Sequence, residues 1–313
     1  MRLFFARKHM SGSMTINASA LSAQDSADEP LSPRHFLAYL TANDGRDFSI
    51  DYLNFRNMAQ LHPGVPLVEI TIAISEVRKR SSFDVRQVDA LVRLVSAVPW
   101  IKVLAVIWKD NLGRDFSSAE KALRFIAPTA GDDDAVMVRN RSAYGPFAAG
   151  WYAKYQSQFH SRADSGLVGN TIHLSGPPNM PDGMDPRHVQ TYVYLSQWRH
   201  LRALLDDFPG RQCTDNPGAI LHGELGLSQR MMARGLSLSC LHWPDHGFAT
   251  ASIDDPSLPA GDIKSTVEGL PFRYKFPAYR RALLPQILRL AWAFKARLPK
   301  FFRRKQAAFI THS

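Results

Sequence analysis

The first half of the chain alternates short apolar runs with segments of helical periodicity, and this order restricts the fold more than any other feature. Four runs have the length and composition of strands: residues 35–41, 65–75, 100–108 and 135–138. Helical spacing occurs between them, at residues 83–98 and 117–126. Strands that alternate with helices indicate a mostly parallel α/β sheet with right-handed crossovers. We therefore expect a single sheet of this kind, flanked by helices.

The second half is less regular, and its elements are predicted from shorter signals. Helical segments are expected at residues 147–159, 186–208 and 223–234, and strands at residues 167–174 and 236–241. Pro186 suits the first turn of the long helix, and Gly235 suits the end of the last one. These elements all fall within residues 33–250, which are expected to form one domain.

The fourth strand-like run ends in polar residues. Ala135 to Val138 is followed by Arg139 to Ser142, and then by Tyr144 and a Gly-Pro pair. Open α/β sheets bind ligands at the carboxyl ends of their strands, so a site is expected here. Three acids, Asp132 to Asp134, resemble hard oxygen ligands for a cation. They precede the run, however, and should form a solvated turn at the opposite edge of the sheet.

A second polar turn, from Asn111 to Asp115, follows the third strand-like run and precedes a helix. Its groups should therefore lie at the same edge of the sheet. Gly113 permits a positive φ, Arg114 can reach a phosphate, and Asp115 can accept hydrogen bonds from a sugar or a base. The alternative is structural: Asp115 would cap the helix and form a salt bridge with Arg114. The spacing alone does not decide between these two interpretations.

Four short motifs occur in an order that resembles a known family. They are Asn-x-Gly-x-Asp-Phe at 111–116, Asn-x-Ser-x-Tyr-Gly-Pro at 140–146, Asp-x-Gly at 164–166 and His-x-Gln-x-Tyr at 188–192. In this order they resemble the glycosyltransferases called rhamnan synthesis protein F-like, over roughly residues 100–245. The resemblance implies a GT-A fold, in which a nucleotide-binding α/β sheet holds the donor.

The resemblance also implies a reaction. A sugar, such as rhamnose or another 6-deoxysugar, would pass from a nucleotide diphosphate to a saccharide or lipid-linked glycan acceptor in cell-surface glycan synthesis. The residues expected to bind the donor lie at strand ends and in the turns after them: Thr41, Asn43, Asn111, Gly113, Arg114, Asp115, Asn140, Arg141 and Ser142. The residues expected to contact the acceptor are Tyr144, His188 and Gln190.

One position departs from the GT-A pattern. Enzymes of this type usually carry an Asp-x-Asp at the end of the fourth strand, which holds a divalent cation on the diphosphate. Here the corresponding residues are Asn140, Arg141 and Ser142. An arginine cannot ligate a cation, although it can bind a diphosphate and neutralise its charge. We therefore predict no metal ligand, while Mn²⁺ or Mg²⁺ on the donor stays open as an alternative.

Glu224 is the predicted catalytic base. It lies near the start of the helix expected at 223–234, similar to the segment in inverting GT-A enzymes where an acid deprotonates the acceptor hydroxyl. The helix dipole would favour a carboxylate there, so simple N-terminal capping is the structural alternative. Asp164 is the next candidate for the base. Because the Asp-x-Asp is absent, a catalytically inactive GT-A-like domain that binds glycan or partner transferases is the second functional hypothesis.

The distribution of charge excludes a nucleic-acid-binding body. Of the 38 Lys and Arg residues, eleven lie from residue 271 onward with no acid among them, so residues 1–270 carry about −1 of the total +10. Residues 285–299 have the pattern of an amphipathic helix with a basic face, which would lie on an anionic membrane surface. The alternative is a helix docked on the domain.

These features complete the expected organisation. Residues 1–32 form a polar N-terminal segment expected to be mobile, residues 33–250 the GT-A-like domain, and residues 251–313 a linker and basic amphipathic tail. The two cysteines lack the spacing of a metal site and indicate a reducing compartment. We expect a cytoplasmic protein, held peripherally at the inner face of the membrane by its tail.

Overall fold

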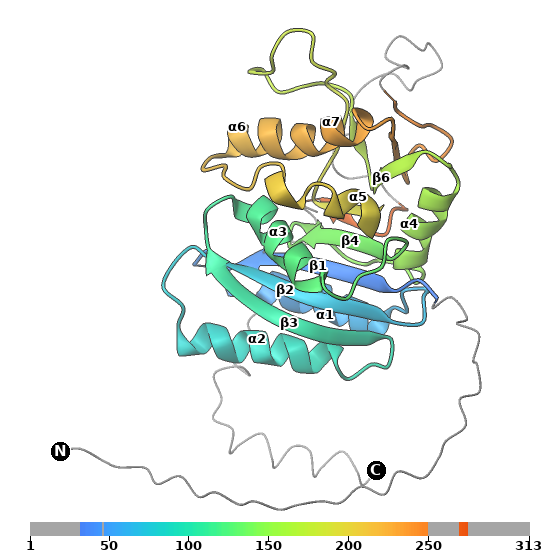
Figure 1. Ribbon diagram of the computed structural model, residues 1–313. Helices are drawn as coiled ribbons and strands as arrows, with labels where there is room; N and C mark the ends of the chain where they lie inside the picture. The colour runs from blue at the N-terminus through green and yellow to red at the C-terminus, as the bar shows by residue number, and fades with distance from the viewer. Residues whose placement is uncertain (1–31, 46, 250–268, 275–313) are drawn as a thin grey trace, which may run out of the picture. The chain divides into compact units, whose positions relative to one another are not determined.

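A seven-stranded sheet forms the centre of the computed structural model, which describes residues 32–45, 47–249 and 269–274 (Figure 1). In the order β10-β6-β9-β4-β1-β2-β3, the strands are Ser237–Cys240, Ser165–Gly169, Val193–Gln197, Ala135–Asn140, His35–Ala42, Val68–Glu76 and Ile101–Asp110. Strand β9 is antiparallel to both of its neighbours, and every other neighbouring pair is parallel. The expected mostly parallel sheet is confirmed.

Helices cover both faces of this sheet (Figure 1). One layer contains α1 (Ser49–Gln60), α2 (Ser82–Val95) and α4 (Trp151–His160), and the other contains α3 (Arg114–Ile126), α5 (Trp198–Arg202) and α7 (Gly226–Met232). In β1, Leu37 and Tyr39 pack into the first layer, while Phe36, Ala38 and Leu40 pack into the second. Burial on both faces explains why the strands are nearly continuous apolar runs.

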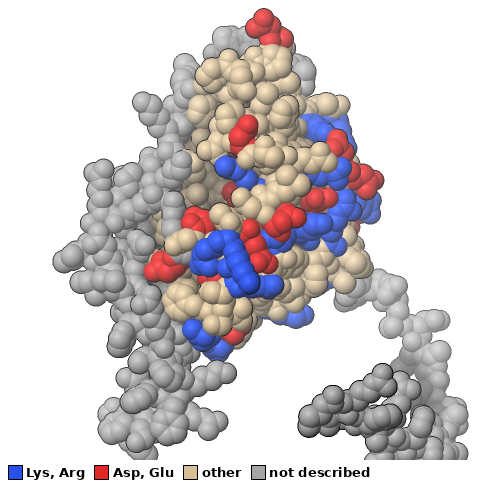
Figure 2. Space-filling model, turned by 90° about the vertical axis from the view of Figure 1, so that its left-hand side faces the viewer, with Lys and Arg blue, Asp and Glu red and all other residues tan. Residues whose placement is uncertain are grey.

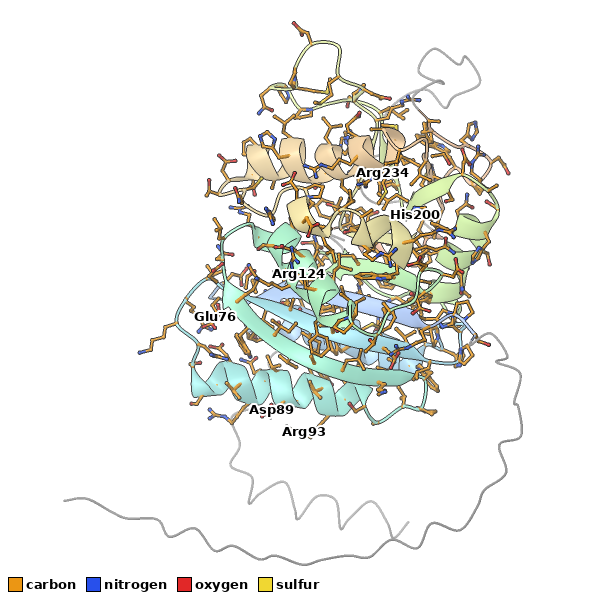
Figure 3. The ribbon with its side chains drawn as sticks, in the orientation of Figure 1. Glu76, Asp89, Arg93, Arg124, His200 and Arg234 are labelled. Atoms are coloured by element: carbon orange, nitrogen blue, oxygen red, sulfur yellow. The ribbon has the colours of Figure 1, made fainter. Side chains whose placement is uncertain are left out.

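Arginine side chains tie the second helical layer together. Arg124 of α3 donates a hydrogen bond to the carbonyl oxygen of Leu205 (2.6 Å), and Arg234 donates one to the carbonyl oxygen of Ala203 (2.8 Å). Arg124, His200 and Arg234 all lie in this layer, away from Glu76, Asp89 and Arg93 (Figure 3). Burial, with the charges of Arg199 and Arg234, lowers the pKa of His200. These two hydrogen bonds connect α3 to the turn at Leu205, and the residues after α7 to the end of α5.

The prediction of a long helix over residues 186–208 is wrong. This stretch forms β8 (His188–Val189), β9, the short helix α5 and the 3-10 turn η1 (Leu205–Asp207). In β9, Val193 and Leu195 pack on one face of the sheet and Tyr194 on the other, so both faces are apolar and the two-residue period is hidden. Strand β8 pairs instead with β7 (Ile172–His173) in a small separate ribbon.

Residues 269–274, within the segment predicted as a linker, belong to the core of the domain. Strand β11 (Arg273–Tyr274) pairs with β5 (Ala143–Tyr144), and Phe272 is completely buried. The Arg139 guanidinium lies 4.5 Å from the centroid of the Phe272 ring, and the Asn170 side chain donates a 2.7 Å hydrogen bond to the Phe272 carbonyl oxygen. The folded domain therefore extends beyond residue 250.

We predict that Phe272→Ala lowers the free energy of unfolding by about 3–5 kcal/mol, because it empties a packed aromatic position. Urea denaturation followed by tryptophan fluorescence measures this difference. Val85→Ala is the matched control, since Val85 is 40% exposed on α2 and should change stability by about 0.5 kcal/mol or less. A Phe272→Ala variant as stable as this control would mean that residues 269–274 do not contribute to the core.

Two predictions concern residues outside the described ranges. The segment predicted to be mobile, residues 1–32, lies outside these ranges except for Ser32. The amphipathic helix predicted at 285–299 also lies outside them. Among the described helices, none is both long enough and apolar enough to cross a bilayer.

Candidate active site

A cavity of about 740 Å³ opens where the parallel strands end, and segments from both halves of the chain line it. It is bounded by the start of α3, the turn after β4, the β7–β8 ribbon with its loop, the helical segment after Asp215, and Tyr274. In Figure 1 the arrowhead of β3 marks this edge, and Figure 2 faces it, with acidic and basic side chains interleaved across the surface. This is the edge at which open α/β sheets bind ligands.

Seven of the predicted site residues line this cavity: Arg114, Asp115, Asn140, Ser142, His188, Gln190 and Glu224. They come from four segments of the chain that the fold brings together. Three of the four motifs on which the family resemblance depends therefore meet here, and the Asp-x-Gly motif at 164–166 does not. The roles of these residues stay predictions.

The turn before α3 is held in an unusual backbone conformation. Gly113 has a φ of +70°, and Arg114, a residue with a side chain, has a φ of +49°. A Cβ on Gly113 would lie 1.9 Å from the carbonyl oxygen of Arg211, so only glycine fits this approach. A left-handed arginine costs on the order of 1–3 kcal/mol, and such conformations persist where the surrounding structure imposes them. Here the conformation brings Arg114 to the cavity wall, against the side-chain oxygen of Asn216.

The capping alternative for Asp115 does not agree with this geometry. Gly113 occupies the N-cap of α3, which makes no side-chain capping hydrogen bond. Instead the Asp115 carboxylate accepts a 2.9 Å hydrogen bond from the Asn140 amide across the cavity floor. Burial raises the pKa of Asp115, and the Asn140 hydrogen bond and the charge of Arg141 only partly oppose this effect. A carboxylate so poorly solvated would gain from hydrogen-bond donors on a ligand.

Glu224 lies within a π-helical segment, η2 (Ala219–Leu225), which joins α6 (Asn216–Gly218) to α7. The predicted position near a helix start is therefore wrong, because the helical run begins at Asn216 and the dipole of a first turn does not act on Glu224. A Cβ on Gly223 would lie 2.2 Å from the Phe116 ring, so this glycine lets η2 pack directly against α3. Short π-helical segments are rare and often occur at functional sites.

Glu224 lines the cavity, and its carboxylate lies near the imidazole of His188. Its side chain is 29% exposed, and its Oε2 lies 3.9 Å from Nε2 of His188, whose side chain is 5% exposed. Gln190, which also lines the cavity, accepts a 2.6 Å hydrogen bond from the Thr171 hydroxyl. Contact between Glu224 and an acceptor hydroxyl is therefore compatible with the geometry, whereas capping of a helix start is not.

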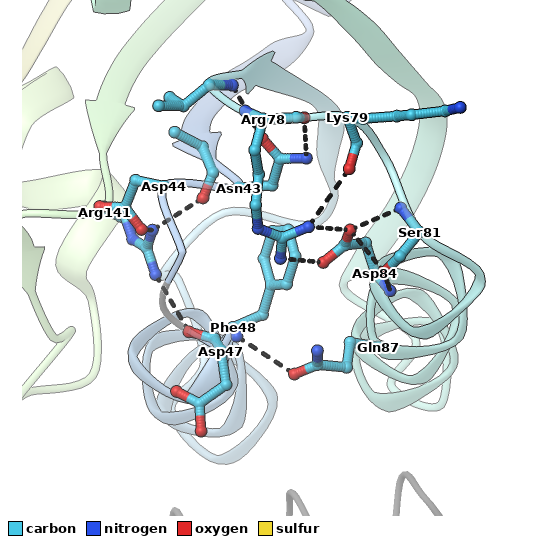
Figure 4. Close-up of polar contacts among 12 residues, drawn as sticks. Asn43, Asp44, Asp47, Phe48, Arg78, Lys79, Ser81, Asp84, Gln87 and Arg141 are labelled. Atoms are coloured by element: carbon cyan, nitrogen blue, oxygen red, sulfur yellow. Dashed lines mark hydrogen bonds and ion pairs between the residues drawn. The ribbon is translucent and has the colours of Figure 1, made fainter.

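Thr41 and Asn43, predicted as donor contacts, are buried and do not line the cavity. The Asn43 oxygen accepts hydrogen bonds from the backbone N–H groups of Val77 (2.8 Å) and Arg78 (3.3 Å), and its amide donates to the Arg78 carbonyl (Figure 4). Asn43 thus fastens the end of β1 to the turn after β2. This internal role accounts for an asparagine at this strand end without a ligand.

The turn after β2 is fixed in the same network. Arg78 donates two 2.7 Å hydrogen bonds to Asp84, which also forms the capping box of α2 with Ser81 (Figure 4). Burial alone would raise the pKa of Asp84, but the hydrogen bonds from Arg78 and Ser81 hold it below its ordinary value. The charged groups at this end of β2 therefore compensate one another.

Arg141 is also engaged within the protein. Its guanidinium forms ion pairs with Asp51 (2.9 Å) and Asp44 (3.3 Å) and donates a 2.8 Å hydrogen bond to the Ala42 carbonyl oxygen. Figure 4 shows its contacts with the loop between β1 and α1. Arg141 does not line the cavity, so Arg114 is the arginine that faces it.

The remaining predicted residues lie away from the cavity. Tyr144, predicted to contact the acceptor, belongs to β5, is 1% exposed and does not line the cavity. Asp164 precedes β6, which runs parallel to β4, and it therefore lies at the opposite edge of the sheet, where it pairs with Arg162 at 3.5 Å. Asn111 is exposed in the turn outside the lining, and Gly113 contributes only its backbone conformation.

Among the lining residues that were not predicted from the sequence are His173, Tyr274 and Asn216. His173 stacks on His188 (centroids 5.4 Å apart, planes at 18°), and Tyr274 stacks on Tyr192 (5.2 Å, 28°). Asn216 contacts Arg114 from the start of α6. None of them belongs to the four motifs, and Tyr274 lies in the predicted linker. For Tyr274, only the apolar residues Leu270 and Phe272 shortly before it in the sequence could have indicated a strand.

In the described part of the chain, the cavity shows no cluster of metal ligands. Within the described ranges, no three His, Cys, Asp or Glu side chains are placed to share a metal ion. The Asn140 oxygen accepts a 2.9 Å hydrogen bond from the backbone N–H of Ser142, and its amide donates to Asp115. Both ends of this side chain are thus already used.

The sequence matches no protein-family model and no curated protein. Among solved structures, it is similar to 4-diphosphocytidyl-2C-methyl-D-erythritol synthase, with 13% identity, a TM-score of 0.38, and 83% of this chain and 98% of that chain covered. It is also similar to the mannosyltransferase PcManGT from Pyrobaculum calidifontis in complex with GDP-Man and Mn²⁺ (10%, 0.41, 66% and 55%) and to S. aureus TarS 1-349 (12%, 0.40, 70% and 61%). The chain thus spans less than two thirds of the last two. Likeness at this level identifies neither a shared family nor a shared activity.

Proposed function

We propose that this protein is an inverting glycosyltransferase, which transfers a sugar from a nucleotide-diphosphate donor to a saccharide acceptor. The observation that carries the proposal is the convergence of Arg114, Asp115 and Glu224 on one cavity at the carboxyl edge of the sheet. At about 740 Å³ the cavity has the size of a small-molecule site. The motif order that resembles the rhamnan synthesis protein F-like enzymes supports rhamnose or another 6-deoxysugar as the transferred group, in cell-surface glycan synthesis.

The residues would divide the reaction between them. Arg114 would bind the diphosphate through charge-assisted hydrogen bonds, and Asp115, held by Asn140, would accept hydrogen bonds from hydroxyl groups of the donor. Glu224 would remove the proton of the acceptor hydroxyl while that oxygen bonds to the anomeric carbon. The bond from the anomeric carbon to the diphosphate breaks, and the nucleoside diphosphate leaves with the electron pair. We assign no step to a divalent cation.

Donor binding tests the first half of this assignment. We expect Arg114→Gly and Asp115→Asn each to weaken the binding of the nucleoside diphosphate about tenfold or more, since a hydrogen bond to a charged group contributes about 1.5–3 kcal/mol. Arg114→Gly removes the guanidinium but suits the φ of +49°, so the fold should be kept. Calorimetry with a panel of nucleoside diphosphates and nucleotide sugars measures the affinities.

Asp164→Asn is the control for these variants, because the half-buried Asp164 lies at the opposite edge of the sheet from the cavity. Its donor affinity should equal that of the wild type. Wild-type affinity in both Arg114→Gly and Asp115→Asn would exclude the start of α3 from the donor site.

The absent Asp-x-Asp favours a second candidate function, a GT-A-like domain that binds glycan or partner transferases without catalysis. Transfer and hydrolysis assays distinguish the two. An enzyme releases nucleoside diphosphate from its donor in the presence of acceptor, whereas the inactive domain binds ligands without releasing it.

A further inference from the structure

We propose that His188 is a positioning residue that relays the proton of the reaction: its imidazole takes from Glu224 the proton that Glu224 removes from the acceptor. This inference rests on the proposed transferase function and adds a second member to its base. Both side chains line the cavity, and they come from segments 36 residues apart, β8 and η2.

The hydrogen bond of one ring nitrogen determines the state of the other. Nδ1 of His188 lies 2.7 Å from the carbonyl oxygen of Pro186. A carbonyl oxygen can only accept, so Nδ1 carries a hydrogen whether the ring is neutral or charged. Nε2 is therefore the nitrogen that gains and loses a proton, and it is the atom that lies 3.9 Å from Oε2 of Glu224. In neutral His188, Nε2 therefore carries a lone pair. This lone pair can accept a proton from Glu224.

Burial makes this arrangement specific to the pair. The His188 side chain is 5% exposed, and its ring lies in a stack with His173 that limits its rotation. Glu224, at 29% exposed, is the partner in contact with the open cavity. An acceptor hydroxyl in the cavity can thus reach Glu224, the more exposed of the two side chains.

The other titratable groups on the elements that pack against β8 are directed elsewhere. His173 on β7 directs Nδ1 toward Ser175, and His222 on η2 lines a different cavity. Arg230 on α7 pairs with Asp207, and burial raises the pKa of the Cys240 thiol on β10 to about 11, so that it stays neutral. Strand β6 carries no titratable side chain.

One ion pair adjoins His188 in the sequence. Arg187 and Asp185 bind each other, and the Arg187 guanidinium also donates a 2.9 Å hydrogen bond to the Ala249 carbonyl oxygen. Their charges compensate each other. Of the charged side chains on these elements in the described part of the chain, Glu224 lies 3.9 Å from Nε2.

The proton can be followed through the reaction. It leaves the acceptor oxygen as that oxygen bonds to the anomeric carbon, and it passes to Glu224. It then moves to Nε2 of His188, which leaves a carboxylate beside an imidazolium, and the imidazolium releases it to water after the product departs. The 3.9 Å separation must shorten to hydrogen-bond distance, as catalytic hydrogen bonds often do when substrate binds.

A relay of this kind requires neutral His188 at the start of each cycle. The wild-type kcat should therefore fall on the acid side of its pH profile as His188 becomes protonated. A carboxylate base acting alone stays active down to about pH 4–5. The acid side of the pH profile thus separates the relay from a purely structural histidine.

Two measurements test the inference. In His188→Gln we expect donor affinity to be unchanged, kcat to fall about tenfold or more, and the acid limb of the kcat profile to move to lower pH. His222→Gln is the control, since His222 lines a different cavity, and its acid limb should match that of the wild type. Independently of activity, NMR should show a lower titration midpoint of His188 in Glu224→Gln than in the wild type, because an opposite charge within about 4–6 Å favours the imidazolium.

The outcomes keep the two proposals apart. Suppose that the wild-type enzyme is active, but His188→Gln keeps the wild-type acid limb or the His188 midpoint does not respond to Glu224→Gln. The relay is then wrong, and the proposed transferase function is unaffected. If the His188 midpoint responds to Glu224→Gln but the protein transfers no sugar, the proposed transferase function and the relay are both wrong.

Discussion

Glu224→Gln should lower the rate of sugar transfer by about 10²- to 10⁴-fold, the usual contribution of general base catalysis. Donor affinity should be unchanged, since Glu224 would contact the acceptor. The substitution preserves the size of a side chain that is 29% exposed and outside both hydrophobic cores, so the fold should tolerate it. Steady-state kinetics gives the loss in kcat, and calorimetry with the donor shows that the variant still binds.

Asp164→Asn serves again as the matched control and should keep wild-type kinetics, because its carboxylate lies at the opposite edge of the sheet. If Glu224→Gln retains full transfer, the base is another group. Asp115 is then the carboxylate to examine, since it shares the cavity and burial raises its pKa. Retained transfer would also remove the basis of the relay by His188.

The four strands of the first half could be predicted within three residues of their observed bounds. Their apolar runs are long, rich in β-branched residues and bounded by turns, and burial on both faces leaves few polar interruptions. Helix α1 was not predicted, because its sequence mixes buried polar residues, including Asp51 and Asn54, with its apolar ones. Those residues are satisfied by tertiary contacts that the sequence does not reveal.

The site was predictable where turns follow parallel strands. Arg114, Asp115, Asn140 and Ser142 lie at the cavity because every parallel strand ends at the same edge. The same rule included Thr41, Asn43 and Arg141, whose side chains bind the protein itself. A strand end gives the position of a residue along the sheet, whereas the partner of its side chain depends on distant elements such as α1 and the turn after β2.

The contributions from the second half depend on packing that a linear pattern does not contain. Glu224 reaches the cavity because Gly223 lets the π-helical segment contact Phe116, 107 residues earlier in the chain. Tyr274 reaches it because β11 pairs with β5. Both are long-range contacts between short elements, for which period and propensity give little signal.

Arg141→Ala should lower the free energy of unfolding by about 3–5 kcal/mol, the usual cost of removing one partner from a buried ion pair. Asp51 is completely buried, and its carboxylate binds Arg141 at 2.9 Å and accepts a 2.9 Å hydrogen bond from the Tyr39 hydroxyl. Without the guanidinium, Asp51 would keep a buried charge with one neutral donor. Urea denaturation at neutral pH measures the loss.

The double variant Arg141→Met with Asp51→Asn separates this structural role from donor binding. It removes both charges together, and such replacements are often close to neutral for stability. We expect it to recover most of the stability lost in Arg141→Ala and to bind the donor as the wild type does, because Arg141 does not line the cavity. If Arg141→Ala is instead fully stable and both variants lose donor affinity, Arg141 binds the diphosphate directly, and the assignment of that role to Arg114 is wrong.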